Sequence, residues 1–223
     1  MSGKADRDWR TWHREYDDPD SSLSRRLSVV RTMLASTLAT LSEEGNEEIG
    51  LVSLCAGDGR DTLPVLAETA ATHVRALLVE LDDDLAQAAR HKSADVGLTH
   101  VEVRTADAGT TASFADRLPC DVLMLCGVFG NIPDEDVRRT ITAVPALLRR
   151  GGVVIWTRGQ SSGADDPTRV AGDPSEWVRE ISRTTGLDEV EFVKPEDAGF
   201  RVGRHRMDTA ATSSPPGRLF DFA

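Results

Sequence analysis

The chain has 223 residues and a mass of 24.2 kDa, a length that suits one large α/β domain or two small ones. Hydrophobic residues make up 39% and charged residues 28% of the chain, and this balance excludes a protein that is disordered throughout. The net charge of −11 argues against a nucleic-acid partner, because a surface that holds a phosphate backbone needs clustered cations.

The cysteines and the N-terminus bear on location. Cys55, Cys120 and Cys126 are odd in number and follow no zinc-binding spacing, so we expect no metal site and a reducing, cytoplasmic location. The first residues contain no apolar segment of the kind found in signal peptides. The longest apolar run, Val122 to Cys126, is far shorter than the ~20 residues that cross a bilayer, so no membrane association is expected.

The predicted elements, in chain order, begin with an amphipathic helix, because apolar residues recur every three or four positions from Leu23 to Leu41. Strands and helices then alternate. The predicted strands are 49–55, 74–80, 101–104, 121–126, 153–157, 189–193 and 200–206. The predicted helices between them are 59–71, 82–94, 134–150 (interrupted by Pro145) and 175–184. The final residues, rich in Thr, Ser and Pro, are expected to be irregular.

This alternation predicts a doubly wound, Rossmann-like α/β fold with a mostly parallel seven-stranded sheet. The last two strands are joined by only about six residues, which allows an antiparallel hairpin but no parallel crossover. One antiparallel strand is therefore expected near an edge. We divide the chain into an N-terminal helical lid segment (1–48), the sheet domain (49–207) and a C-terminal tail (208–223).

Ligands of such sheets sit beyond the carboxyl ends of the strands, and four of these ends carry suitable residues. The first strand runs into Cys55-Ala56-Gly57-Asp58-Gly59-Arg60-Asp61, where glycines allow a ligand to approach the backbone. Glu80 ends the second strand at the spacing of a ribose-binding acid, although a solvated helix cap is the alternative. Asp107, after the third strand, could accept a hydrogen bond from an exocyclic amine or simply cap a loop. The fourth strand leads into a turn with Cys126, Gly127, Phe129 and Asn131.

The block LVSLCAGDGRD resembles the glycine motif of the class I S-adenosylmethionine-dependent methyltransferases. Gly57 and Gly59 match that motif, whereas Cys55 replaces its usual first glycine and Ser53 its usual acidic residue. The resemblance covers roughly residues 49–207 and implies that Glu80 holds the ribose and that Asp107 recognises the adenine amine. It implies the following residues at the S-adenosylmethionine site: Cys55, Ala56, Gly57, Asp58, Gly59, Asp61, Glu80, Leu81, Asp107, Ala108, Cys126 and Gly127.

Aromatic residues are concentrated near the N-terminus, where Trp9, Trp12, His13 and Tyr16 lie within eight positions. They either pack a helix on the core or form a lid over the cofactor and the acceptor, with their rings facing a cation. Our candidates for catalysis are His13, Tyr16 and Asn131. Our candidates for binding the methyl acceptor are Trp12, Phe129, Trp156 and Arg158, of which the arginine would suit an acceptor with a carboxylate.

The resemblance predicts an enzyme that transfers a methyl group to a small-molecule acceptor by in-line displacement. One alternative is a non-catalytic S-adenosylmethionine-binding scaffold protein. A less favoured one is a nicotinamide-dependent oxidoreductase. The chain lacks the third glycine of the dinucleotide motif. It also lacks the Tyr-x-x-x-Lys pair of short-chain dehydrogenases, because Tyr16 is the only tyrosine. The sequence leaves the oligomeric state undetermined.

Overall fold

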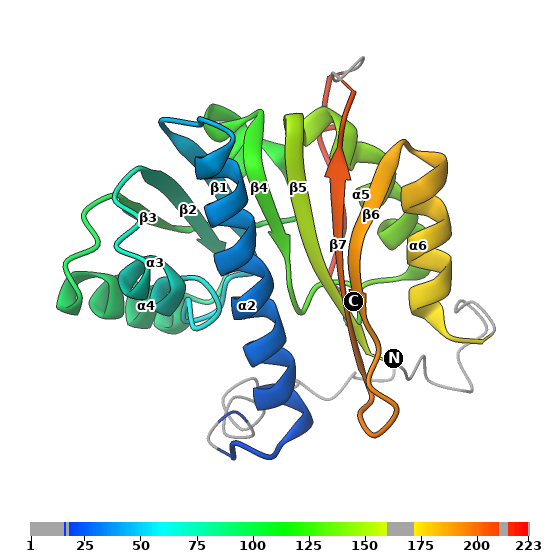
Figure 1. Ribbon diagram of the computed structural model, residues 1–223, viewed down its shortest axis with the longest axis horizontal. Coiled ribbons are helices and arrows are strands. Elements are labelled where there is room, and N and C mark those ends of the chain that lie inside the picture. Colours follow the sequence, from blue (N-terminus) through cyan, green and yellow to red (C-terminus); the bar gives the residue numbers. More distant parts are fainter. Residues whose placement is uncertain (1–15, 17, 160–171, 210–213, 223) are drawn as a thin grey trace, which may run out of the picture.

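The computed structural model describes residue 16 and residues 18–159, 172–209 and 214–222. These residues form one seven-stranded sheet in the order β3-β2-β1-β4-β5-β7-β6 (Figure 1). Strand β7 runs antiparallel to both of its neighbours, and every other pair is parallel. The predicted Rossmann-like α/β fold, with one antiparallel strand near an edge, is confirmed.

The elements have the following bounds. The strands are β1 (Ile49–Leu54), β2 (Val74–Glu80), β3 (Val101–Thr105), β4 (Cys120–Leu125), β5 (Leu148–Gly159), β6 (Leu187–Val193) and β7 (Phe200–Met207). The α-helices are α2 (Ser22–Glu43), α3 (Leu63–Glu68), α4 (Asp83–Asp95), α5 (Asp134–Leu147) and α6 (Pro174–Thr184), and η2 (Thr111–Ser113) and η3 (Ala115–Arg117) are single 3-10 turns. In the described part of the chain, no helix has the length and apolar character needed to cross a membrane.

The bounds predicted for two helices and one strand were wrong. The helix expected at 59–71 is reduced to α3, because the residues before Pro64 form a turn and Ala70 adopts a positive φ of 47°. The helix expected to reach residue 150 ends at Leu147, and Pro145 lies in its last turn rather than at an interruption. Proline has no N–H to donate to the carbonyl of Ile141, four residues earlier, so one helical bond is absent just before α5 ends. Strand β5 then starts at Leu148 and runs through both glycines that were expected to precede it.

Helices cover both faces of the sheet, and two separate groups of buried side chains result. In Figure 1, α2 crosses in front of the sheet and α5 lies behind it. Strand β5 supplies both faces by alternation: Val153 and Ile155 join the core under α2 and α3, whereas Val154 and Trp156 join the core under α5 and α6. The buried side of α2, centred on Leu34, packs directly on the sheet. Helix α2 is therefore a fixed layer of the fold.

The end of the chain is docked, although it forms neither helix nor strand. We call residues 214–222 the C-terminal strap. Its Leu219 and Phe220 are completely buried and share a core with β1 and β2. The connection from β3 to β4 contains only the turns η2 and η3, where a doubly wound fold commonly has an α-helix. Phe114 and the strap fill the space over this part of the sheet.

Candidate active site

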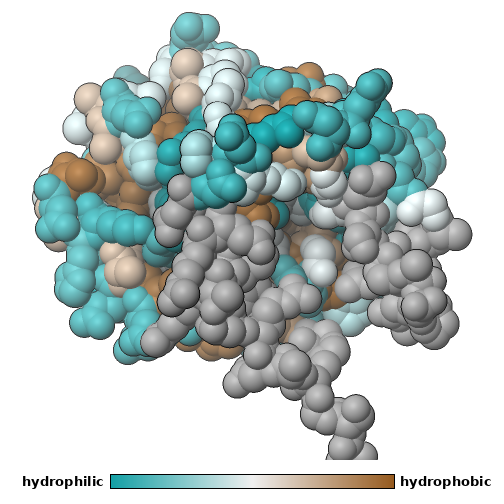
Figure 2. Space-filling model, turned by 90° about the horizontal axis from the view of Figure 1, so that it is seen from below, coloured by the Kyte–Doolittle hydropathy of each residue, from teal (hydrophilic) through white to brown (hydrophobic). Residues whose placement is uncertain are grey.

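The carboxyl ends of the parallel strands meet at the edge that Figure 1 shows at the bottom, and Figure 2 looks onto this edge from below. The loop after β1 turns sharply here. Cys55 adopts a positive φ of 55°, which costs a non-glycine residue energy and explains why glycine is usual at this point of the motif. Gly59 has a φ of 73°, and a Cβ on it would lie 2.6 Å from Leu63 Cδ1. The loop can therefore keep this path only with Gly59 unsubstituted.

Glu80 joins this loop to the end of β2. One carboxylate oxygen accepts the backbone N–H of Gly57 at 2.7 Å. The other accepts the N–H groups of Leu81 and Asp82, both at 2.9 Å. A carboxylate has about four acceptor positions, so Glu80 has about one left for a ligand.

Asp107 occupies the matching place after β3. One oxygen accepts the N–H of Gly109 at 2.8 Å, and the other binds Arg218 Nη1 of the C-terminal strap at 2.5 Å. The Asp107 side chain is 42% exposed, so its remaining acceptor positions are accessible. Glu80 and Asp107 are thus two fixed acceptors on adjacent strands of one edge.

Leu81 and Ala108 follow these two acids. Leu81 is 64% exposed and presents an apolar side chain beside the carboxylate of Glu80. Ala108 is buried and packs in the core under α5. Of the two residues, Leu81 is the one whose side chain a ligand could cover.

Asp58 holds the glycine loop against α4. Arg60 binds both of its oxygens, at 2.8 and 2.7 Å, and Lys92 Nζ binds one of them at 2.5 Å. Burial alone would raise the pKa of this carboxyl, but the hydrogen bonds from Arg60 and Lys92 outweigh it and lower the pKa well below its usual range. The Asp58 side chain is therefore committed to the loop's structure, and what remains for a ligand here is mainly its backbone.

The turn after β4 is held from two sides. Gly127 N–H donates to the hydroxyl of buried Thr157 at 2.8 Å. Its carbonyl accepts Asn131 Nδ2 at 2.6 Å. Asn131 therefore fixes the backbone that passes Cys126, whatever else its amide contacts.

Both thiols at the edge are neutral. Burial raises the pKa of Cys55 well above its ordinary value, and the charges of Glu80 and Asp107 raise it further. Burial also raises the pKa of Cys126, with Asp61 adding to the effect. Because the thiolate is the nucleophilic form of cysteine, neither residue is suited to covalent catalysis near neutral pH.

Tyr16 lies against the glycine loop together with α2. Its hydroxyl accepts Arg26 Nη2 at 2.6 Å, and the Arg60 guanidinium carbon lies 4.3 Å from its ring centre. Arg31 donates to the carbonyl of Arg60 at 2.8 and 2.5 Å. Burial raises the pKa of Tyr16, with Arg26 opposing it, so the phenol is neutral near pH 7. These contacts place a predicted catalytic residue at the edge where β1 ends.

Asp61 belongs to the same group of side chains. It is 9% exposed, and its carboxylate accepts the Thr62 hydroxyl at 3.1 Å. Burial raises its pKa, and the negative charge of Asp58 adds to this, whereas the cation of Arg26 lowers it. A buried acid with this balance would gain from a cation brought next to it.

Phe129 and Trp156 are not at a binding surface, which corrects the prediction that they contact the acceptor. Both are at most 1% exposed and lie in the core under α5 and α6. The Trp156 ring stacks on His205 at 6.0 Å and donates from Nε1 to His205 Nδ1 at 3.1 Å. Side chains of β5 alternate between the two faces of the sheet, and this register directs Trp156 into the core rather than toward the strand end.

Arg158 is buried in an ion pair. Its guanidinium donates to Asp134 Oδ1 and to the carbonyl of Phe129, both at 2.6 Å. The side chains of Arg158 and Asp134 are 2% and 6% exposed. We predicted that Arg158 would bind a carboxylate of the acceptor. The structure corrects this, because the Arg158 guanidinium is buried and already paired with the carboxylate of Asp134. The predicted residues Trp12 and His13, with Trp9, lie outside the described residues.

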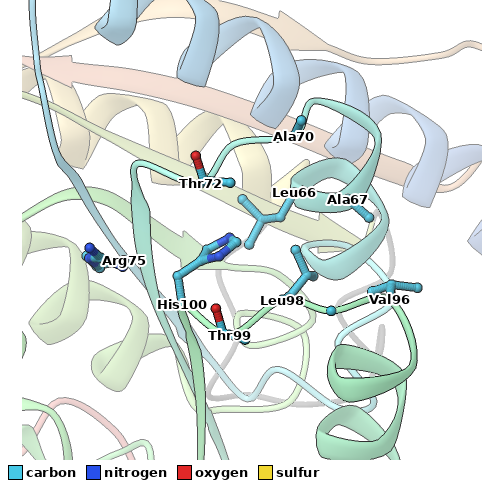
Figure 3. Close-up of a pocket in the computed structure, with 10 residues that line it drawn as sticks. Leu66, Ala67, Ala70, Thr72, Arg75, Val96, Leu98, Thr99 and His100 are labelled. Carbon is cyan, nitrogen blue, oxygen red and sulfur yellow. The ribbon is translucent and has the colours of Figure 1, made fainter.

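A cavity of about 310 Å³ lies elsewhere, between α3 and the loop that joins α4 to β3 (Figure 3). Its lining includes Arg75 and His100, which stand at the amino ends of β2 and β3. Glu80 and Asp107 lie at the opposite, carboxyl ends of the same strands. This cavity is therefore separate from the candidate site.

Sequence reasoning missed Arg26, Thr157 and Arg218. A role for Arg26 could have been suspected, because this charged residue lies between Leu23 and Leu27 in the apolar pattern of the helix before the first strand. Thr157 has no polar neighbour in the sequence that predicts its contact with Gly127. Arg218 contacts Asp107 from 111 positions away, and no local pattern indicates that pairing.

Residues 52–152 match the family model of a methyltransferase domain. The chain resembles the magnesium protoporphyrin IX methyltransferase of Synechocystis PCC 6803 solved with SAH, at 15% identity over 89% of this chain and 93% of that one, with a TM-score of 0.61. It also resembles the N-methyltransferase NodS of Bradyrhizobium japonicum WM9 (21% identity, 81% and 97% of the chains, TM-score 0.53). A third similar structure is the CurJ carbon methyltransferase, at 16% identity over 91% of this chain and 59% of that one, with a TM-score of 0.68. These structures share the fold. No curated protein sequence matches the chain.

The match to a methyltransferase domain covers residues 52–152, and the strand order and the acids at the carboxyl edge are consistent with a class I S-adenosylmethionine-dependent methyltransferase. Two of the structures with a similar fold were solved with SAH and with SAM bound.

Proposed function

We propose that this enzyme methylates a small-molecule acceptor and that its cofactor lies along the carboxyl edge of β1, β2, β3 and β4. The observation that carries the proposal is Glu80, whose carboxylate bonds to the glycine loop after β1 and to the start of the next helical turn. Asp107 stands one strand away with acceptor positions to spare. This pair matches a ribose and an adenine amine in chemistry and in order along the sheet.

The residues around this pair fit the rest of the cofactor. Glu80 takes one ribose hydroxyl directly, since about one of its acceptor positions is open. Leu81 offers its exposed side chain to the adenine face. Asp61, buried and acidic, suits the ammonium of the methionine part, while the backbone of Ala56, Gly57 and Gly59 lines the near wall. Cys126 and Gly127 would adjoin the sulfur of the cofactor. The Cys126 thiol is neutral, because burial raises its pKa.

The bound donor supplies an electrophilic methyl group. The protein's task is then to orient the acceptor in line and to exclude water, which together can supply much of the rate. We assign the orienting role to Tyr16 on one side and to the turn held by Asn131 on the other. His13 and Trp12 lie outside the described residues and stay candidates from the sequence alone, three and four positions before Tyr16.

The segment 1–48 would close the site. Tyr16 and Arg31 both contact Arg60 of the glycine loop, so Tyr16 and α2 adjoin the proposed cofactor edge. Helix α2 is the fixed part of this segment, and the lid role falls to the residues before it. The net charge of −11 supports a small acceptor over nucleic acid, and the porphyrin methyltransferase among the similar structures carries a small-molecule substrate in its name.

Titration calorimetry with S-adenosylhomocysteine tests the cofactor assignment. Glu80→Gln keeps the shape of the side chain but removes its charge and turns an amide N–H₂ toward backbone donors. We expect the affinity to fall about ten- to a hundredfold, since hydrogen bonds to charged groups contribute ~1.5–3 kcal/mol. The matched control is Glu102→Gln on β3, whose carboxylate pairs with Arg104 and Arg117 instead. Equal affinities for the two variants would remove Glu80 from the site.

Methyl transfer from labelled S-adenosylmethionine tests the acceptor class. We expect label in a pool of small metabolites and none in RNA or protein from the same cells. Label confined to RNA or protein would overturn the small-molecule proposal and leave the cofactor assignment intact.

A further inference from the structure

We propose that Arg218 of the C-terminal strap is a positioning residue of the cofactor site, which holds the Asp107 carboxylate in the orientation that receives the adenine amine. The inference rests on the proposed role of Asp107 and extends the site to a segment outside the matched domain, which ends at residue 152. Arg218 Nη1 lies 2.5 Å from Asp107 Oδ2.

The strap is anchored on both sides of Arg218. After it, Leu219 and Phe220 are fully buried, and the carbonyl of Leu219 accepts Arg139 Nε at 2.9 Å and the Thr140 hydroxyl at 3.2 Å. Before it, the carbonyl of Gly217 accepts the N–H of Thr111 at 3.2 Å. The backbone at Arg218 is therefore held by the core and by hydrogen bonds on either side.

The strap also pairs with the loop that carries Asp107. Thr110 and Arg218 form an isolated antiparallel bridge, and Leu219 N–H donates to the carbonyl of Gly109 at 2.7 Å. Gly109 permits this approach because a Cβ on it would lie 2.1 Å from the carbonyl oxygen of Phe220. The loop after β3 is thus shaped to receive the strap.

Two donors fix the Asp107 carboxylate. Gly109 N–H holds one oxygen and Arg218 holds the other, so the carboxylate cannot rotate without losing a bond. About two of its four acceptor positions stay open for an incoming amine. Arg218 is itself held by the carboxylate of Asp221, and the N–H of Asp221 donates to Asp136 at 2.8 Å. In the described residues, the ion pair of Asp107 is the one with Arg218.

Without Arg218, the carboxylate would keep its bond to Gly109 but could turn about its side-chain torsions. Because Asp107 and Arg218 are each 42% exposed, water would replace the lost bond, and the cost would fall on ligand recognition more than on folding. A residue with this role should affect how the site distinguishes an amine from a carbonyl at the adenine.

The test is calorimetric and uses two ligands, S-adenosylhomocysteine and S-inosylhomocysteine, in which a carbonyl replaces the adenine amine. In the full-length enzyme, Arg218→Ala should weaken S-adenosylhomocysteine binding about three- to tenfold, the range of a single hydrogen bond to a charged group that is partly open to water. Arg218→Ala should also reduce the ratio of the affinity for S-adenosylhomocysteine to the affinity for S-inosylhomocysteine. Arg218→Lys should restore part of both effects. The matched control, Arg183→Ala, removes an exposed arginine paired with Glu180 on α6 and should change neither.

Asp107→Ala separates the two levels of the proposal. If Asp107→Ala weakens binding and Arg218→Ala does not, the strap inference fails while the role of Asp107 stands. If Asp107→Ala has no effect while Glu80→Gln does, both the adenine assignment and the strap inference fail. Tighter binding in Arg218→Ala would mean that Arg218 competes with the adenine, and would overturn a positioning role. Support requires that Arg218→Ala adds no further loss when Asp107 is already alanine.

Discussion

The two ends of the candidate site are held in different ways. On the proposed adenosine side, Glu80 is held by backbone N–H groups of the loops after β1 and β2, and Asp107 by the N–H of Gly109 and by Arg218. Both carboxylates keep acceptor positions for a ligand. On the side of β5, the charged group at the strand end is Arg158, which is sealed in an ion pair with Asp134 at a few per cent exposure. Trp156, two positions earlier, is enclosed against His205.

This difference separates recognition from support. A carboxylate that is bound by main chain and open to water can exchange a water for a ligand at little cost. A buried ion pair cannot, because separating it leaves an uncompensated charge in the core. We therefore propose that Glu80 and Asp107, at the carboxyl ends of β2 and β3, bind the ligand, whereas Arg158 at the end of β5 supports the turn after β4 through the carbonyl of Phe129. Under this proposal, the candidates for acceptor specificity are the N-terminal segment and that turn.

The largest expected effect is a loss of stability from a substitution on the supporting side, near the end of β5. Asp134→Ala leaves Arg158 buried without its carboxylate and should lower the free energy of unfolding by about 3–5 kcal/mol. Urea unfolding measures this loss. The neighbouring Glu135→Ala removes an exposed acid whose side chain is 73% exposed and should cost at most about 0.5 kcal/mol.

The same variant also tests whether support and recognition are separate. The folded fraction of Asp134→Ala should bind S-adenosylhomocysteine with unchanged affinity, because Asp134 contacts none of the proposed cofactor residues. A large loss of affinity in folded protein, with little loss of stability, would show that the β5 side takes part in cofactor binding.

A smaller effect follows from pH at His205. Burial lowers the pKa of this histidine to about 4, and its Nδ1 must stay unprotonated to accept the indole N–H of Trp156. The unfolded chain binds the proton more tightly, with a pKa of about 6.5. Stability is therefore complete above pH 6.5 and falls as the pH drops toward 4, with a loss of about 2 kcal/mol at pH 5.

His205→Asn isolates this contribution. The asparagine oxygen can accept the indole N–H but does not titrate, so the difference in unfolding free energy between pH 7.5 and pH 5 should shrink by about 2 kcal/mol. An equal difference in both proteins would assign the pH dependence to other groups, such as Glu189 nearby.

The positions of Glu80 and Asp107 could be predicted from the sequence better than those of Trp156 and Arg158, and the reason is physical. Glu80 and Asp107 follow apolar strands directly, so chain order alone places them at the carboxyl edge. Trp156 and Arg158 also end an apolar strand, but a strand buried on both faces has no polar alternation to show where its last side chains point. The pairing of Arg158 depends on Asp134, which the tertiary fold brings into contact.

Two further features depend on contacts between distant parts of the chain. Asp58 lies in the glycine loop and was predicted to bind the cofactor. Its carboxylate instead bonds to Lys92 on α4, a contact that the local sequence does not indicate. The tail was correctly expected to be irregular, but nothing local predicted that Phe220 would fill the core where an α-helix between β3 and β4 is missing. Regular elements follow from local patterns, whereas docked irregular segments do not.

The smallest expected effect is on ligand affinity and tests whether the adenine covers Leu81 on the recognition side. Leu81 is 64% exposed, so Leu81→Ser should leave the free energy of unfolding nearly unchanged. If the adenine covers this side chain, partial burial of the leucine contributes ~1 kcal/mol and its loss should weaken S-adenosylhomocysteine binding about fivefold. Val190→Ser on β6, at 50% exposure, is the matched control and should bind normally. Unchanged affinity in Leu81→Ser, together with a clear loss in Glu80→Gln, would keep the ribose at Glu80 and move the adenine away from Leu81. Arg218 and Asp107 would then have to be tested for another part of the cofactor, because the adenine between Leu81 and Asp107 is what links the strap to binding.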